Sequence, residues 1–110
     1  MLEVSIKFKQ VKYPKMIGKT TGGLYTNATL KISEDALRFE HNNFKVFKYL
    51  FNQLPIQFYI NQKLSLKIYI NQFDEYKIKY STANKDCEIT FKILGETPEA
   101  FRVLFEKWKT

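Results

Sequence analysis

The chain has 110 residues, of which 45% are hydrophobic and 26% charged, and its formal net charge is +7. That length allows one domain (residues 1–110) with one core, and the apolar fraction is too high for a disordered chain. No apolar run reaches the roughly 18 residues that a membrane-spanning helix needs. The first 20 residues hold no continuous apolar stretch, so we expect no secretory signal and a cytoplasmic protein, free or peripheral to a membrane.

Lysine supplies most of the positive charge. It accounts for 16 of the 18 basic residues, and the only arginines are Arg38 and Arg102. Lys, Asn, Ile, Phe and Tyr make up 50 of the 110 residues, a bias typical of a bacterial genome of low G+C content. A surface selected to bind phosphate favours arginine, whose planar fork binds two oxygens at once. The charge alone therefore does not identify a polyanionic partner.

The first half of the chain predicts three strands. Residues 2–9 alternate apolar and polar side chains, which is typical of a strand with one face on the core. Tyr13-Pro14 interrupts this pattern, and we interpret residues 12–23 as a basic loop. Alternation resumes over 24–32 and again over 37–41, with a polar turn between, so these two segments predict a hairpin.

Residues 44–54 are ambiguous between two structures. A strand near 44–49 would have apolar side chains on both faces. A helix would begin after Asn43 and end at Pro55, with one apolar stripe. We favour the strand, although the period of so short a run does not decide between them.

The second half predicts four further strands and one helix. Alternating segments cover 56–60, 64–70, 76–80 and 87–93, and polar turns separate them. Because no helices lie between them, they predict an antiparallel meander rather than βαβ units. The final element is an amphipathic helix over 98–109, with Thr97 as its N-cap and Pro98 in its first position. Its apolar stripe consists of Phe101, Leu104, Phe105 and Trp108.

The expected fold class is therefore α+β: mostly antiparallel β, with about seven to eight strands in a barrel or sandwich, closed by the C-terminal amphipathic helix. This order of elements resembles the pleckstrin-homology-like (PH-like) superfold, and the local pattern is most similar to its bacterial PH and GRAM-like members. The resemblance covers residues 22–109 and leaves the strand at 2–9 as an extra one. The residues that carry it are Gly23-Leu24-Tyr25-Thr26-Asn27 with Leu30, the strand Leu37-Arg38-Phe39-Glu40, Leu54-Pro55-Ile56, the hairpin 76–80 with 87–93, and the helix ending in Trp108.

The resemblance implies a non-enzymatic binding or adaptor module. PH-like domains commonly bind phosphoinositides, other anionic lipids or peptides, and the lipid-binding members carry several basic residues on the first hairpin. The matching hairpin here combines Lys31 and Arg38 with the acidic Glu34-Asp35 turn and with Glu40. We therefore do not expect phosphoinositide recognition at that hairpin.

No catalytic set is apparent in the sequence, and we expect neither an enzyme nor a cofactor nor a metal site. His41 is the single histidine and the one candidate for acid–base chemistry, but its neighbour Glu40 lies on the opposite face of the strand. Cys87 is the single cysteine, so an internal disulfide is excluded. It lies in phase with Ile89 and Phe91, which is typical of a buried apolar residue.

The strongest functional signal is a basic N-terminal stretch without acidic residues. Its candidate residues for binding an anion or a partner are Lys7, Lys9, Lys12, Tyr13, Lys15 and Lys19. We expect a protein partner first and an anionic lipid surface second. The alternative is a small basic β-barrel that binds nucleic acid, encoded on a phage or another mobile element.

Overall fold

The computed structural model describes residues 1–14, 21–22, 25–41, 55–82 and 85–109. Its elements are β1 (Leu2–Pro14), β2 (Thr21–Gly22), β3 (Thr26–Ile32), β4 (Ala36–His41), β5 (Ile56–Tyr59), the 3₁₀ helix η2 (Ile60–Ser65), β6 (Lys67–Ile70), β7 (Tyr76–Ser81), β8 (Lys85–Ile93) and α1 (Glu99–Trp108). The segment 44–54, for which the sequence favours a strand over a helix, lies outside the described residues.

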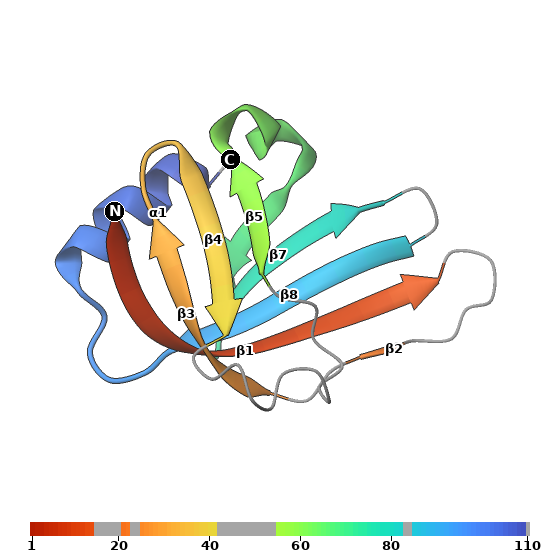
Figure 1. Ribbon diagram of the computed structural model, residues 1–110, viewed down its shortest axis with the longest axis horizontal. Helices are drawn as coiled ribbons and strands as arrows, with labels where there is room; N and C mark the ends of the chain where they lie inside the picture. Colours follow the sequence, from red (N-terminus) through yellow and green to blue (C-terminus); the bar gives the residue numbers. More distant parts are fainter. Residues whose placement is uncertain (15–20, 23–24, 42–54, 83–84, 110) are drawn as a thin grey trace.

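All the described strands join one antiparallel sheet in the order β5-β4-β3-β1-β8-β7-β6, and β2 pairs with β1 off this path. Figure 1 shows the sheet curling into a half-barrel, with α1 across one end of the strands. The α+β class, mostly antiparallel with one C-terminal helix, is confirmed. The two halves of the sheet meet at β1, which pairs with β3 on one side and with β8 on the other.

The first strand is longer than predicted and lies in the middle of the sheet. The sequence placed a break at Tyr13-Pro14, but β1 continues through both residues, which pair with Asp86 and Lys85 of β8. The pattern failed because Gln10 and Lys12 are polar side chains at positions where core residues were expected. Their backbone groups still join the β1–β8 ladder, so the strand does not end there.

The core lies inside the curl of the sheet and beneath α1. Phe8, Phe39 and Phe91 form a chain of ring contacts at centroid distances of 5.2 and 5.4 Å. The helix adds the buried Phe101, Phe105 and Trp108, as its apolar stripe predicted. Helix α1 begins one residue later than expected, because Pro98 rather than Thr97 occupies the N-cap position.

The predicted strand over 64–70 is formed only in its second part. Residues 60–65 form η2 instead, where the Gln62 side chain accepts a hydrogen bond from the Tyr59 backbone N–H at 2.8 Å. Leu64 consequently projects into solvent and is 92% exposed, whereas Leu66 and Ile68 join the core. The alternation of apolar residues therefore predicted the strand correctly only over its second part, β6, which begins at Lys67.

Candidate functional site

The sheet has an inner face on the core and an outer face in solvent, and successive residues of a strand alternate between them. In β1 the buried Ile6 and Phe8 lie on the inner face, so Lys7 and Lys9 lie on the outer face. The predicted binding residues are thus divided. Lys7, Lys9 and Tyr13 are on the outer face, Lys12 is on the inner face, and Lys15 and Lys19 lie outside the described residues.

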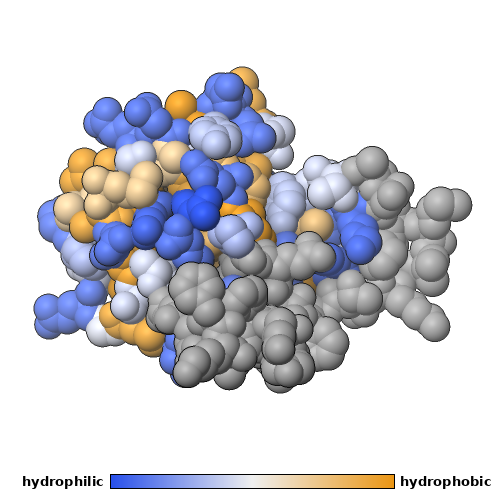
Figure 2. All heavy atoms as spheres, viewed as in Figure 1, coloured by the Kyte–Doolittle hydropathy of each residue, from blue (hydrophilic) through white to orange (hydrophobic). Residues whose placement is uncertain are grey.

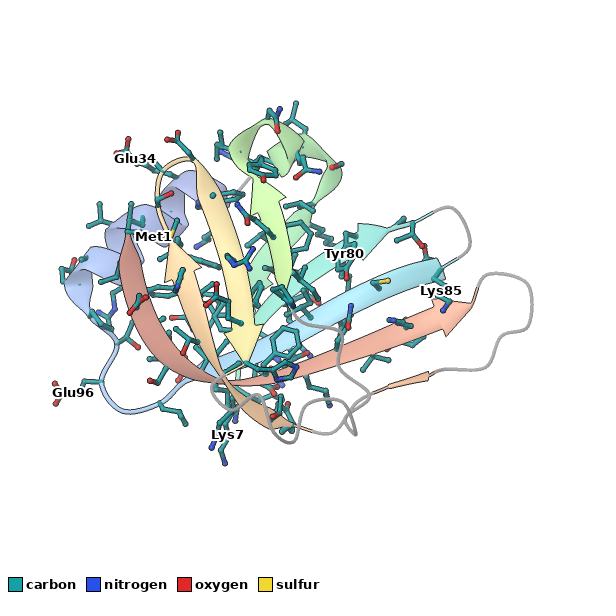
Figure 3. The ribbon with its side chains drawn as sticks, in the orientation of Figure 1. Met1, Lys7, Glu34, Tyr80, Lys85 and Glu96 are labelled. Atoms are coloured by element: carbon teal, nitrogen blue, oxygen red, sulfur yellow. The ribbon has the colours of Figure 1, made fainter. Side chains whose placement is uncertain are left out.

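A second strand contributes a lysine that the sequence had not singled out. Lys92 of β8 lies directly opposite Lys7 of β1, and both side chains are exposed. Figure 3 shows Lys7 projecting away from the sheet. Neither residue forms an ion pair with any residue that the structure describes. Like charges directly opposite each other on an antiparallel pair destabilise the sheet, so this arrangement favours an anion bound from outside.

The outer sides of β6 and β7 repeat this arrangement. Lys67 lies directly opposite Lys79, and each ammonium group is 5.7 Å from the centroid of the Tyr69 ring. We call the outer surface of the four strands β1, β8, β7 and β6 the lysine face. Its cationic members are Lys7, Lys9, Lys67, Lys77, Lys79 and Lys92.

Tyr25, which lies just before β3, reaches across the lysine face. The Nζ atom of Lys9 lies 4.7 Å from the centroid of its ring. Its hydroxyl donates a hydrogen bond to Oε2 of Glu75 at 3.0 Å. Burial, followed by this bond to the carboxylate, raises the pKa of Tyr25. Lys9 therefore contacts the face of the Tyr25 ring and Glu75 binds its hydroxyl, and together they hold the side chain against the sheet.

Two carboxylates lie among these lysines. Glu88 is 3.3 Å from Nζ of Lys77 and 3.7 Å from Nζ of Lys79. Glu75 accepts a hydrogen bond from Nδ2 of Asn71 at 2.9 Å. That bond, then the one from Tyr25, then the charges of Lys77 and Lys92 lower the pKa of Glu75. Both carboxylates already have partners, and the six lysines outnumber them, so the lysine face keeps an excess of positive charge.

The other half of the outer face is neutralised by its own acids. Nζ of Lys31 lies 3.5 Å from Glu3 and 3.1 Å from Glu40. Arg38 pairs with Glu40 and donates a hydrogen bond to Oε1 of Gln57 at 2.9 Å. The bonds from Arg38 and Lys31 lower the pKa of Glu40. The excess charge is consequently confined to the β1, β8, β7 and β6 side.

Lys12 belongs to a different environment, on the inner face at the far end of β1. It lies opposite Cys87, whose other neighbour across the sheet is Tyr80. Burial, followed by the charge of Lys85, lowers the pKa of Lys12. The buried Gln10 side chain donates a hydrogen bond to the Tyr80 hydroxyl at 2.7 Å. Burial, then the neighbouring Cys87, raises the pKa of Tyr80 to about 12, so this phenol is neutral at physiological pH.

The inner face does not bring together a catalytic pair. His41 lies opposite Ala28, which pairs with Ile6, whereas Cys87 lies opposite Lys12. Ile6 and Lys12, the β1 residues in the rows of His41 and Cys87, are six positions apart, which is about 20 Å along a strand. His41 is half-buried, and burial lowers its pKa. Within the described ranges, no group of three His, Cys, Asp or Glu side chains could hold a metal ion.

Hollows on the surface are lined by both polar and apolar side chains. One of about 560 Å³ lies beside η2 and the ends of β7 and β8, and Leu64 and Tyr80 are among its lining residues. In the view of Figure 2, hydrophilic and apolar side chains lie side by side over the coloured residues. No helix in the described part of the chain has the length and apolar character needed to cross a membrane.

Comparison with known proteins returned no match: no protein-family model, no curated protein and no solved structure matches this chain. Function must therefore be inferred from the site alone. Sequence reasoning found Lys7 and Lys9 but missed Lys77 and Lys92. The alternation of the predicted strands indicates that both side chains face outward, but their position beside Lys7 and Lys9 depends on the strand order.

Proposed function

We propose that this protein is a non-enzymatic binding module of PH-like type that holds an anionic partner on its lysine face. The partner is an acidic segment of another protein or an anionic membrane surface. Six antiparallel strands on the path of the described sheet lie within the residues that the resemblance covers, and the C-terminal helix follows them, which supports the PH-like interpretation. The observation that carries the binding role is the opposed, exposed pair of Lys7 and Lys92, neither of which forms an ion pair with a described acid.

The expected strength of binding follows from the number of lysines available. A lysine close to an anionic leaflet contributes about 1 kcal/mol, and that contribution falls off within a Debye length of roughly 10 Å at 0.1 M salt. Lys77 and Lys79 already pair with Glu88, which leaves Lys7, Lys9, Lys67 and Lys92 as the main contributors. Four such contributions amount to about 4 kcal/mol, so binding should be weak, reversible and sensitive to salt.

Co-sedimentation with vesicles tests the membrane branch. Vesicles with and without phosphatidylserine are compared for the wild type and for the double variant Lys7→Gln, Lys92→Gln. The matched control is Lys63→Gln, Lys109→Gln, which removes the same charge from η2 and from the end of α1. We expect recovery with the anionic vesicles only, lost in the first variant and retained in the control.

An acidic probe tests the protein branch with the same three proteins. Immobilised poly-glutamate should retain the wild type and the control at low salt and release the Lys7, Lys92 double variant. If neither anionic vesicles nor poly-glutamate distinguishes the double variant from the control, the lysine face is not a binding surface and the proposal is overturned.

Single-stranded nucleic acid is a second candidate, favoured by the aromatic side chains of the lysine face. Tyr25 lies beside Lys9, and Tyr69 lies between Lys67 and Lys79. Rings next to cations suit bases and phosphates together. This candidate predicts a gel shift with single-stranded probes that weakens steeply as salt rises. An absence of retardation at low salt, with single- and double-stranded probes, eliminates it.

A further inference from the structure

A cleft of about 400 Å³ lies where the β6–β7 turn, the end of β8 and the start of α1 meet. The side chains that matter around it are Phe73, Asp74, Tyr76, Lys92, Thr97 and Arg102. A volume of this order is typical of sites for small molecules. A second hollow of about 260 Å³ continues along α1 and shares Asp74, Tyr76 and Arg102 with the first.

Two cations from different elements border this cleft, and neither forms an ion pair with a described residue, although the charge of Lys92 reaches the Glu75 carboxylate and lowers its pKa. Lys92 comes from β8 and Arg102 from α1, and both are exposed. Asp74 borders the same cleft, yet neither cation forms an ion pair with it or with another described residue. Glu96 precedes the helix, and Figure 3 shows it pointing away from the molecule. The two cations are therefore available to a ligand.

Two aromatic side chains, Tyr76 and Phe73, line the cleft, and ring contacts hold the first of them in place. Tyr76 stacks on Phe91 with a centroid distance of 5.0 Å, and the edges of Phe101 and Phe105 contact its ring at 5.4 and 5.0 Å. Phe73 forms part of the wall, and its side chain is 66% exposed.

The turn that carries Phe73 is also well defined. Oδ1 of Asn71 accepts hydrogen bonds from the backbone N–H groups of Phe73 at 2.9 Å and Glu75 at 3.0 Å. The carbonyl of Asn71 accepts a third, from the N–H of Asp74 at 3.2 Å. These bonds define the backbone of the turn that presents the Phe73 ring to solvent, where a flat ligand can stack on it.

The chemistry of these groups indicates one class of ligand. A guanidinium fork binds two phosphate oxygens together, and a nearby ammonium adds a point charge. The exposed Phe73 ring provides a surface for stacking, and a carboxylate such as Asp74 accepts hydrogen bonds from hydroxyl groups. We propose that the cleft binds a phosphomonoester attached to a flat ring, the chemistry of a nucleoside monophosphate. This goes beyond the proposed function, which requires only the lysine face.

Titration followed by amide NMR tests this site with three probes: AMP, adenosine and inorganic phosphate, all at the same ionic strength. AMP should shift the resonances of Asp74, Gly95 and Arg102 together, and it should bind at least about tenfold more tightly than either fragment. Arg102→Gln should weaken AMP binding by at least about tenfold, because hydrogen bonds to charged groups are the strong ones. Phe73→Ser should reduce the affinity for AMP to that for phosphate and leave phosphate binding unchanged.

Lys7→Gln is the matched control, since it removes the same charge from the lysine face without bordering the cleft. It should leave AMP binding unchanged while weakening binding to anionic vesicles or poly-glutamate, so the two proposals fail separately. The proposal is overturned if AMP at about 5 mM moves none of the three resonances. It is overturned equally if Lys7→Gln weakens the binding of AMP as much as Arg102→Gln does, or if inorganic phosphate binds as tightly as AMP.

Discussion

Replacing Lys7 with glutamate should make the folded protein more stable while removing the binding of anions that we propose for the lysine face. In the wild type, Lys7 and Lys92 are directly opposite on neighbouring antiparallel strands, and both are exposed. Such a pair costs about 0.2–1 kcal/mol relative to neutral residues. The substitution replaces this repulsion with an attraction between the introduced carboxylate and the unchanged ammonium group of Lys92.

The size of the effect can be worked from the geometry of the ladder. Opposed side chains have Cβ atoms about 5 Å apart, and two charges about 6 Å apart in water interact by roughly 0.7 kcal/mol. Reversing one charge changes the sign of that energy. After allowance for screening and side-chain freedom at an exposed site, we expect a gain of about 0.5–1 kcal/mol in the free energy of unfolding.

Urea denaturation in low salt measures this gain, and a double-mutant cycle identifies its origin. The benefit of Lys7→Glu should vanish in a Lys92→Gln background, because the partner charge is then absent. It should also shrink in 1 M salt, where the Debye length is about 3 Å. If Lys7→Glu lowers the urea midpoint, or if its benefit survives in the Lys92→Gln background, the account of this pair is incorrect.

Three further predictions concern buried polar groups. Trp108→Phe removes the indole N–H that donates to the Ser33 carbonyl at 2.9 Å and should lower the free energy of unfolding by about 1–3 kcal/mol; an unchanged urea midpoint would contradict this. Burial raises the pKa of Tyr80 to about 12, so its contribution to stability is present below pH 10 and is lost as the pH rises toward 12. Phenolate absorbance should show a transition near pH 12 that Tyr80→Phe abolishes. Burial lowers the pKa of His41 below its ordinary 6.5, so its contribution is full above pH 6.5 and is lost as the pH falls through the folded-state value. His41→Gln should therefore lose less stability between pH 7.5 and 5.5 than the wild type, and equal losses would refute the assignment.

The sequence correctly predicted the elements in which one apolar period continues along the whole segment. The β3–β4 hairpin and helix α1 have clear apolar periods and polar ends, and both form within one or two residues of the expected positions. The end of β1 was missed because its inner positions, Gln10 and Lys12, are polar. Gln10 is buried by its hydrogen bond to Tyr80, a partner 70 residues away that no local pattern reveals.

The lysine face shows the same limit for function. The outward phase of Lys7 and Lys9 follows from alternation within one strand. The proximity of Lys92 depends on which strand pairs with β1 and in which register. Antiparallel hairpins indicate which consecutive strands are neighbours, whereas the pairing of the first strand with the last joins residues that are far apart in the chain. The sequence therefore predicted the β1 lysines of the site but not the β8 lysine that lies beside them.

The pattern of charges on the sheet also bears on the origin of the lysine excess. A genome of low G+C content supplies lysine at every solvent-facing position alike, so a purely compositional excess would be spread over the outer face without regard to neighbours. On the β3–β4 side, however, Lys31 is placed between Glu3 and Glu40. On the β1–β8 side, Lys7 faces Lys92 at a cost to stability. A biased composition accounts for the number of lysines but not for an arrangement that pairs those on one half of the face with acids and leaves Lys7 and Lys92 unpaired, and this arrangement supports the binding surface that we propose.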